Sequence, residues 1–220
     1  MEFSIEQFKK DANQLLEAFN NAVPTENSFA LSGWKLEGDG HSVYLSHPSI
    51  VTYHEKINSL DNKEDEVLLG EDNEIFLDPH QYSPNVQGSE KEPIQWDFSI
   101  VYSETYRAPV LYFRVQNLEG SPCGRSKVLD LLPSQAIIDS WDFVSQEEHP
   151  FLGIPYFFLH PCQASTRLSL VMMGSDGENI CTLWTWMSMV LPAVNHQIPS
   201  LYFKLIQNHL EEKILKYSLK

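Results

Sequence analysis

Basic residues are scarce in this sequence. Its 220 residues include 15 Lys and Arg against 30 Asp and Glu, which gives a formal net charge of −15. Binding to the phosphate backbone of a nucleic acid requires a basic surface, and an anionic membrane surface repels an acidic protein. We therefore expect no nucleic-acid partner and no binding to an anionic membrane. An acidic excess usually serves only solubility, and its more specific use would be to attract a partner with a basic surface.

Long apolar runs and a targeting segment are also lacking. The longest apolar run, "CTLWTWMSMVLPAV", has the length of a buried helix and is too short to span a bilayer. The N-terminal "MEFSIEQFKKDANQLL" has no basic start, apolar centre or cleavage site, which are the marks of a signal peptide. We therefore expect a cytoplasmic protein with no stable membrane insertion.

Cysteine is rare. The chain has three cysteines, Cys123, Cys162 and Cys181, and an odd number cannot form an even disulfide framework. The sequence also has no CxxC pair and no glycine-rich motif of the kind that cradles phosphates. These absences favour a reduced protein with free thiols, and they give no reason to expect a metal or another cofactor.

The residues that are present predict one α+β domain over the whole chain, with 42% hydrophobic residues available for a core. The first segment predicts a helix. Ser4 as N-cap and Gln7 three residues later form a capping-box pattern, and Phe3 and Phe8 have the spacing of a hydrophobic staple. Apolar residues then recur at helical spacing until a segment with Asn and Pro ends the helix.

Alternating apolar residues predict an antiparallel sheet after this helix. Two short strands flank the Gly-Asp-Gly turn in "SGWKLEGDGHSVYLSH", and "IVTYHEKI" either extends the second strand or starts a third. Residues 96–116 show the strongest strand pattern and predict a hairpin with its turn near Arg107. "GIPYFFLH" predicts another short strand. A weak helix interrupted by Pro133, a buried helix at 180–191 that ends at Pro192, and a last amphipathic helix complete an α+β fold with helices against one face of the sheet.

Residues 61–94 interrupt this order. From residue 61 to residue 78 the segment is strongly acidic, with Lys63 as its single basic residue, and the following "DPHQYSPNVQGSEKEP" is rich in turn residues. We predict a mobile acidic insertion within the single domain. The simplest interpretation is a solvated loop, and the functional alternative is a docking segment for a partner.

Cys162 is the cysteine whose surroundings favour chemistry. It follows a predicted strand, and Pro161 restricts the backbone there, so we expect the thiol on a rigid, exposed loop. His160 and Arg167 would favour the thiolate, which is the reactive form. Cys181 lies among apolar residues and is expected in the core, and a buried, unreactive thiol is the simplest role for any single free cysteine. A zinc site has the wrong ligand spacing and a cysteine protease lacks its signature, so both are weaker alternatives.

Three stretches of the chain resemble a known family. "APVLYFRVQNLEG", "SQEEHPFLGIPYFFLHPC" and "WTWMSMVLPAVNHQIP" are similar, in order and spacing, to the autophagy-related protein ten family, the E2-like conjugating enzymes of the autophagy ubiquitin-like system. The specific part of the likeness is the tract that ends in His-Pro-Cys. The resemblance implies a ubiquitin-conjugating-enzyme-like fold, with an N-terminal helix, an antiparallel sheet, and a thiol loop after the sheet.

The resemblance also implies an activity and its partners. The family's cysteine, which corresponds to Cys162, accepts the ubiquitin-like autophagy-related protein twelve as a thioester from an activating enzyme, autophagy-related protein seven. It then transfers this modifier to a lysine of the acceptor, autophagy-related protein five. A thioester is a good acyl donor, and dividing the transfer into two acyl steps is nucleophilic catalysis.

The remaining site residues follow less directly from the resemblance. Ordinary ubiquitin-conjugating enzymes place an Asn several residues before the cysteine, whereas here Cys162 directly follows His-Pro. His160 is therefore a candidate to orient the lysine or to stabilise the oxyanion, and a role in shaping the loop is as good an interpretation. Tyr102, Tyr106 and Tyr112 are candidates to line the substrate site, and core packing is the simpler role for two of the three.

Two other functions stay open at this point. The sister family that joins a ubiquitin-like protein to phosphatidylethanolamine also has His-Pro-Cys, with an earlier His-Pro like that at residues 149–150, but it is longer and differs after the thiol. A non-catalytic binding module on the same fold would leave Cys162 inert. For the enzyme, the acidic excess would steer a basic acceptor, and the hairpin at 96–116 would offer the acceptor a strand edge.

Overall fold

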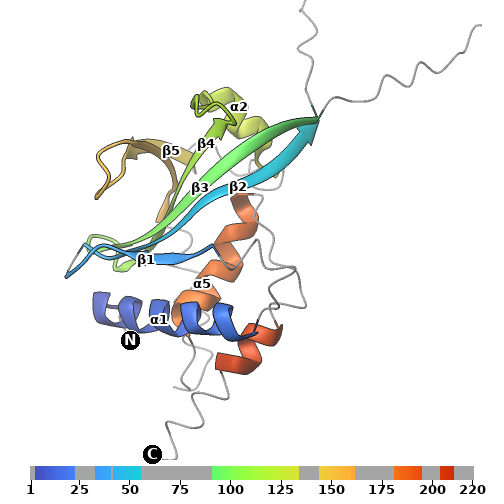
Figure 1. The fold of residues 1–220 in the computed structure, drawn as a ribbon. Helices are drawn as coiled ribbons and strands as arrows, with labels where there is room; N and C mark the ends of the chain where they lie inside the picture. Colours follow the sequence, from blue (N-terminus) through green and yellow to red (C-terminus); the bar gives the residue numbers. More distant parts are fainter. Residues whose placement is uncertain are drawn as a thin grey trace, which may run out of the picture.

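The fold is one antiparallel sheet with helices α1 and α5 against one of its faces (Figure 1). The computed structural model describes residues 3–22, 33–40, 42–55, 91–133, 144–161, 181–194 and 204–210. The named elements are α1 (Ile5–Ala22), β1 (Lys35–Glu37), β2 (Tyr44–Glu55), β3 (Lys91–Ser103), β4 (Ala108–Asn117), α2 (Arg125–Leu131), β5 (Val144–Glu148), β6 (Pro155–Leu159), α5 (Thr182–Val190) and the 3₁₀ helix η2 (Leu191–Val194). The predicted α+β class is therefore confirmed.

The strands of the sheet pair in the order β1-β2-β3-β4-β6-β5. The predicted Gly-Asp-Gly turn joins β1 to β2, and it needs glycine at Gly38, whose φ is +82° and where a Cβ would lie 2.0 Å from the carbonyl oxygen of Ser42. After a register shift between His47 and Ile50, β2 runs on to its last residue opposite Lys91. The described part of "IVTYHEKI", residues 50–55, therefore extends the second strand.

Strand β3 begins earlier than predicted. Residues 91–94, predicted as the end of the acidic insertion, pair with β2, so this boundary of the prediction is wrong. The backbone of β2 pairs with residues 91–94 and makes them a strand, although their polar sequence does not predict one. Pro93 is tolerated because it lies beyond the last β3–β4 pair, Ile94 with Asn117, where the strand has a neighbour on one side. The rest of the predicted insertion, residues 61–90, lies outside the described residues.

The predicted hairpin at 96–116 is present but does not form an edge of the sheet. Strands β3 and β4 pair from Ile94 with Asn117 to Ser103 with Ala108. Strand β2 pairs along the other side of β3, and β6 pairs with β4. In the described sheet the outermost strands are thus β1 and β5. The expectation that this hairpin offers a strand edge is wrong for β3, because β2 pairs along it from Lys91 to Val101.

Strand β5 was not predicted from the sequence. In "VSQEE" only Val144 is buried, and the strand pairs with β6 over five residue pairs. An outermost strand with polar side chains shows almost no apolar alternation, so the main signal for a strand is missing. Charged side chains at a sheet edge also discourage pairing with other chains.

Helix α1 begins as predicted. The backbone N–H of Gln7 donates to Ser4 Oγ at 3.2 Å, which is the N-cap interaction. The Gln7 side chain does not complete the capping box, because its amide donates to the next turn of the helix. Phe3 and Phe8 are both buried, and the ring of Tyr102 lies 6.1 Å and 6.3 Å from theirs. The hydrophobic staple therefore includes a third ring from β3.

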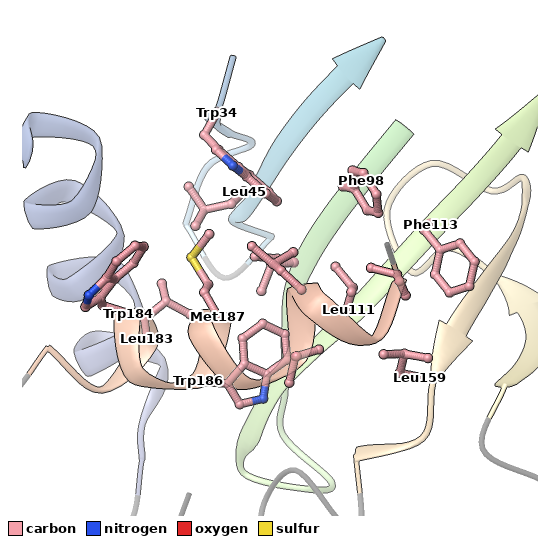
Figure 2. Close-up of a cluster of buried hydrophobic side chains, with 14 of the residues drawn as sticks. Trp34, Leu45, Phe98, Leu111, Phe113, Leu159, Leu183, Trp184, Trp186 and Met187 are labelled. Atoms are coloured by element: carbon pink, nitrogen blue, oxygen red, sulfur yellow. The ribbon is translucent and has the colours of Figure 1, made fainter. Parts of the chain in front are cut away.

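The main core lies between the sheet and α5 (Figure 2). Alternate residues of the strands point to this face. Each large side chain buried there contributes about 1.5–3 kcal/mol relative to an exposed one. The cluster includes Leu183, Trp186 and Met187 of α5 and Leu45, Phe98, Leu111, Phe113 and Leu159 of the strands, and Trp184 of α5 packs in it beside Phe19 of α1.

The C-terminal helices follow the prediction in outline. Helix α5 ends at Val190, and Pro192 lies in the following 3₁₀ turn, where its missing N–H is tolerated. Residues 204–210 form the predicted last helix, with Ile206 and Leu210 buried. None of the described helices is long and apolar enough to cross a membrane.

Candidate active site

The strand that leads to the predicted nucleophile ends at Leu159. His160 follows it half-buried, and Pro161 is buried. Cys162, the next residue, and Arg167, predicted to favour its thiolate, lie outside the described residues. The structure does describe His160 and the three tyrosines that the sequence analysis named as candidates to line the substrate site.

Tyr106 lies beside His160. Its hydroxyl oxygen is 3.5 Å from His160 Nε2, and the two rings meet edge to face with their centroids 5.5 Å apart. Tyr106 comes from the β3–β4 turn and is 43% exposed. A phenol both donates and accepts hydrogen bonds, so it can pair with either tautomer of the imidazole. The structure thus brings the exposed phenol of Tyr106 to the half-buried imidazole of His160, which directly precedes Pro161.

Tyr102 and Tyr112 lie on opposite faces of the sheet. Tyr102 packs towards α1 and donates its hydroxyl to the Phe3 carbonyl at 3.0 Å. Tyr112 is 5% exposed and donates its hydroxyl to Glu147 Oε1 at 2.5 Å. Burial and this carboxylate raise the pKa of Tyr112. Both hydroxyls are engaged within the fold, as the core-packing interpretation of two of the three tyrosines expected, and we keep Tyr106 alone as a candidate substrate contact.

A second aromatic cluster covers the sheet face that points away from α5. His149, in the β5–β6 turn, lies at its centre and is 1% exposed. The ring centroids of Tyr44, Tyr112 and Tyr156 lie 5.4, 5.1 and 5.0 Å from that of His149. The turn after His149 has three large, exposed apolar side chains, Phe151, Leu152 and Ile154, and the Phe151 ring stacks on Tyr44 with the centroids 5.5 Å apart.

The hydrogen bonds of His149 define its tautomer. The backbone N–H groups of Phe151 and Leu152 donate to Nδ1 at 3.2 and 3.3 Å. Nδ1 therefore carries no hydrogen, and Nε2 carries one and donates it to Ser99 Oγ at 2.8 Å. Burial lowers the pKa of His149 to about 4, so the imidazole is neutral at neutral pH.

Mild acid is expected to weaken the fold through His149. With a folded pKa of about 4, this side chain binds a proton more readily in the unfolded chain, where the pKa is about 6.5. The stability contributed by the neutral ring is therefore complete above about pH 6.5 and is lost as the pH falls towards about 4. From pH 7 to pH 5, the free energy of unfolding should fall by about 2 kcal/mol more in the wild type than in His149→Gln. Urea unfolding at both pH values measures this, and equal decreases would contradict it.

The two described cysteines have poorly reactive thiols. Cys181 is 5% exposed, and burial, with Asp11 nearby, raises its pKa. Cys123 is half-buried, and burial raises its pKa as well. A raised pKa leaves little of the nucleophilic thiolate at neutral pH. The prediction that Cys181 packs in the core is confirmed.

Sequence reasoning missed the pair of His149 and Ser99, whose members are 50 residues apart. The sequence indicated only the turn, because "HPFLG" contains turn-forming residues. In the structure, Gly153 of this turn has a φ of +65°. Nothing local pointed to the serine. A histidine can bind a metal, but both ring nitrogens of His149 bind protein groups. Over the described ranges, no three His, Cys, Asp or Glu side chains gather as metal ligands.

Comparisons with known proteins place the chain in a family. The family described as "Autophagocytosis associated protein, active-site domain" matches residues 7–201. The ubiquitin-like-conjugating enzyme ATG10 of Arabidopsis thaliana is 32% identical over an alignment of 192 residues, and the alignment covers 80% of this chain and 80% of the plant protein. The human enzyme of the same name is 33% identical over an alignment of 119 residues, which covers 51% of this chain and only about half, 54%, of the human protein.

The chain is also similar to a solved structure, that of the autophagic E2 Atg10. The alignment covers 90% of this chain and 99% of the Atg10 chain, with a TM-score of 0.46 and 13% sequence identity. The assignment depends instead on the sequence relatives and the family match, which together span most of the chain. The chain therefore belongs to the ATG10 family of ubiquitin-like-conjugating enzymes of autophagy.

Proposed function

We propose that this chain carries the ubiquitin-like autophagy-related protein twelve as a thioester on Cys162. The activating enzyme, autophagy-related protein seven, would supply the modifier, and a lysine of autophagy-related protein five would receive it in the cytoplasm. The observation that carries the proposal is the family match over residues 7–201, which includes the His160-Pro161-Cys162 tract. The poor reactivity expected of the two other thiols supports the choice of Cys162.

The proposed reaction consists of two acyl transfers. First, the Cys162 thiolate attacks the carbonyl carbon of the modifier's thioester with the activating enzyme, a new C–S bond forms, and the activating enzyme's thiolate leaves. Next, a neutral lysine amine attacks the same carbon, a C–N bond forms, and Cys162 leaves as thiolate. The amine loses one proton in this step. The carbonyl carbon keeps its oxidation level throughout, so the balance needs no electron donor or acceptor.

His160 and Tyr106 would act on the second transfer. A protonated lysine must lose a proton before it can attack. The carbonyl oxygen gains negative charge during the attack. The imidazole can accept a hydrogen bond from the amine or donate one to that oxygen, depending on its tautomer. Because the Tyr106 hydroxyl lies 3.5 Å from His160 Nε2, it can hold the ring in one orientation. This would replace part of what the upstream Asn supplies in ordinary ubiquitin-conjugating enzymes.

Removing this hydroxyl should slow the transfer step and spare the charging step. Tyr106→Phe is expected to lower the rate of transfer to lysine about fivefold, the equivalent of one hydrogen bond. His160→Ala should lower it by about a hundredfold, as loss of an oxyanion donor does. Single-turnover discharge of the preformed thioester measures both. Tyr53→Phe is the matched control, since Tyr53 is 68% exposed on β2. Equal rates in Tyr106→Phe and Tyr53→Phe would remove Tyr106 from the site.

The proposed function itself is tested by a charging assay. The wild-type protein is mixed with the activating enzyme, ATP and the modifier, and the products are run on gels with and without reductant. We expect an adduct that reductant removes, and a reductant-resistant product once the acceptor protein is added. An active activating enzyme that gives no adduct with this chain would overturn the proposal.

The same assay separates the two other functions. Vesicles that contain phosphatidylethanolamine replace the acceptor protein in a parallel reaction. Discharge onto the lipid, with none onto the protein, would favour the sister activity. The absence of any adduct, together with binding to the modifier or acceptor, would favour a non-catalytic binding module.

A further inference from the structure

The hairpin of β5 and β6 is joined to the rest of the sheet by few backbone pairs. Ten residue pairs join β3 to β4, and five join β5 to β6. Strand β6 pairs with β4 only at two positions, Tyr112 with Phe158 and Phe113 with Phe157. Side chains must therefore supply much of what holds this hairpin in place, and the hairpin carries His160 at the end of β6.

On the face away from α5, a strip of rings connects the β5–β6 turn to His160. The ring of His149 lies 5.1 Å from that of Tyr112, which stacks on Phe158 at 5.8 Å. The ring of Phe158 lies 6.4 Å from that of His160. Tyr112 also binds β5 through its hydrogen bond to Glu147. A shift of the turn would be transmitted along this strip, because packed rings move together rather than deform.

His149 joins this strip to the centre of the sheet. Its Nε2–H donates to Ser99 of β3, and β3 is separated from β6 by β4. Its Nδ1 accepts two backbone N–H groups of the turn. At 1% exposure, solvent cannot replace either set of bonds, so the loss of one partner leaves a buried polar group unsatisfied.

We propose that His149, through its hydrogen bond to Ser99, is a positioning residue that docks the β5–β6 hairpin on the sheet and so places His160. The chain continues from this strand end directly into Cys162. The catalytic consequence depends on the proposed function, in which His160 acts during transfer. The structural part of the proposal, docking of the hairpin through Ser99, holds or fails independently of it.

Two substitutions of His149 separate its hydrogen bonds. In His149→Gln the terminal amide reaches the place of Nε2 and can still donate to Ser99, but the acceptor for the turn is lost. In His149→Asn the side-chain oxygen takes the place of Nδ1 and caps the turn, but nothing reaches Ser99. Both variants lose the ring contacts. The proposal therefore expects His149→Gln to keep the position of His160 better than His149→Asn does.

Ser99→Ala is the least disruptive test, and Thr52→Val is its matched control. Each substitution removes a hydroxyl that accepts a hydrogen bond from a ring N–H, that of His149 in one case and that of Trp96, at 2.9 Å, in the other. Thr52 lies on β2, outside the aromatic strip. A general loss of stability would affect both variants alike, whereas release of the hairpin would affect Ser99→Ala alone.

The first readout needs no conjugation partner. Tyr106 and Phe158 shift the resonances of the His160 ring protons through their ring currents. In NMR spectra of histidine-labelled protein, these resonances should move towards random-coil positions in Ser99→Ala and His149→Asn. They should stay in place in Thr52→Val and move less in His149→Gln. Unchanged His160 resonances in Ser99→Ala, or equal changes in Thr52→Val, would overturn the proposal.

The second readout is the kinetics of transfer. In single-turnover discharge, Ser99→Ala should slow the rate at saturating acceptor about tenfold, within the roughly hundredfold that an ångström of misplacement costs. The acceptor concentration for half-maximal rate should not change. A higher half-maximal concentration with an unchanged maximal rate would contradict positioning. If the wild type forms no thioester, the proposed function fails, and the NMR result alone still decides whether His149 docks the hairpin.

Discussion

Replacing Cys162 with serine is expected to abolish the reductant-sensitive adduct with the modifier. The thiolate is the attacking group in the first acyl transfer, and a serine hydroxyl is almost entirely protonated at neutral pH. We expect charging to fall by about a thousandfold or more, as when the nucleophile of other covalent enzymes is removed. The measurement is the yield of adduct with time on gels without reductant, beside a sample treated with reductant.

The other two cysteines provide matched controls. Cys181→Ala and Cys123→Ser should charge at the wild-type rate, because burial raises the pKa of both thiols and neither supplies much thiolate. Selective alkylation near neutral pH gives an independent check, since Cys162 should react first. An adduct that survives in Cys162→Ser and disappears in Cys123→Ser would move the nucleophile to the turn after β4.

Replacing Asp11 with alanine is expected to cost about 2–4 kcal/mol of folding free energy, the combined effect of a lost cap and an unsatisfied buried N–H. Asp11 belongs to α1, yet it caps α5. Its Oδ2 accepts the backbone N–H of Leu183 at 2.9 Å, whereas the N-cap residue of α5, Cys181, offers no side-chain cap. The carboxylate is 1% exposed, so water cannot take its place.

The measurement for Asp11 is urea unfolding of the wild type and three variants. Asp11→Asn keeps an oxygen at the capping position and should lose about 1 kcal/mol or less. Asp130→Ala removes an exposed carboxylate from α2 and should change stability by less than about 0.5 kcal/mol. If Asp11→Ala unfolds at the same urea concentration as Asp130→Ala, the cap between the two helices contributes nothing.

Local sequence patterns determined several elements of this protein. Ser4 starts α1 because a hydroxyl before an apolar helical pattern satisfies an N–H of the first turn. Gly38 marks the β1–β2 turn because only glycine fits its backbone. The hairpin of β3 and β4 shows its apolar alternation over a long stretch. In each case the physical cause lies within a few residues of the element, so the sequence shows it directly.

The family, and with it the proposed nucleophile, also came from the sequence. The tract that ends in Cys162 resembles the family at residue level, and no fold argument is needed to see it. The sequence could not rank Tyr102, Tyr106 and Tyr112, because strand alternation and turn geometry decide which face and which end of the sheet each one reaches. The structure places Tyr106 beside His160 and turns the other two hydroxyls into the fold.

Tertiary structure alone decided the contacts between residues that are distant along the chain. Asp11 caps α5 across 172 residues, and His149 donates to Ser99 across 50. The sequence hardly indicates strand β5, because its polar residues show no apolar alternation and pair with β6 through the backbone at the edge of the sheet. Buried polar groups need partners wherever the fold can supply them, and that requirement leaves no periodic trace in the sequence. Local chemistry thus determined the elements and the thiol tract, and packing decided which side chains hold the end of β6 in place.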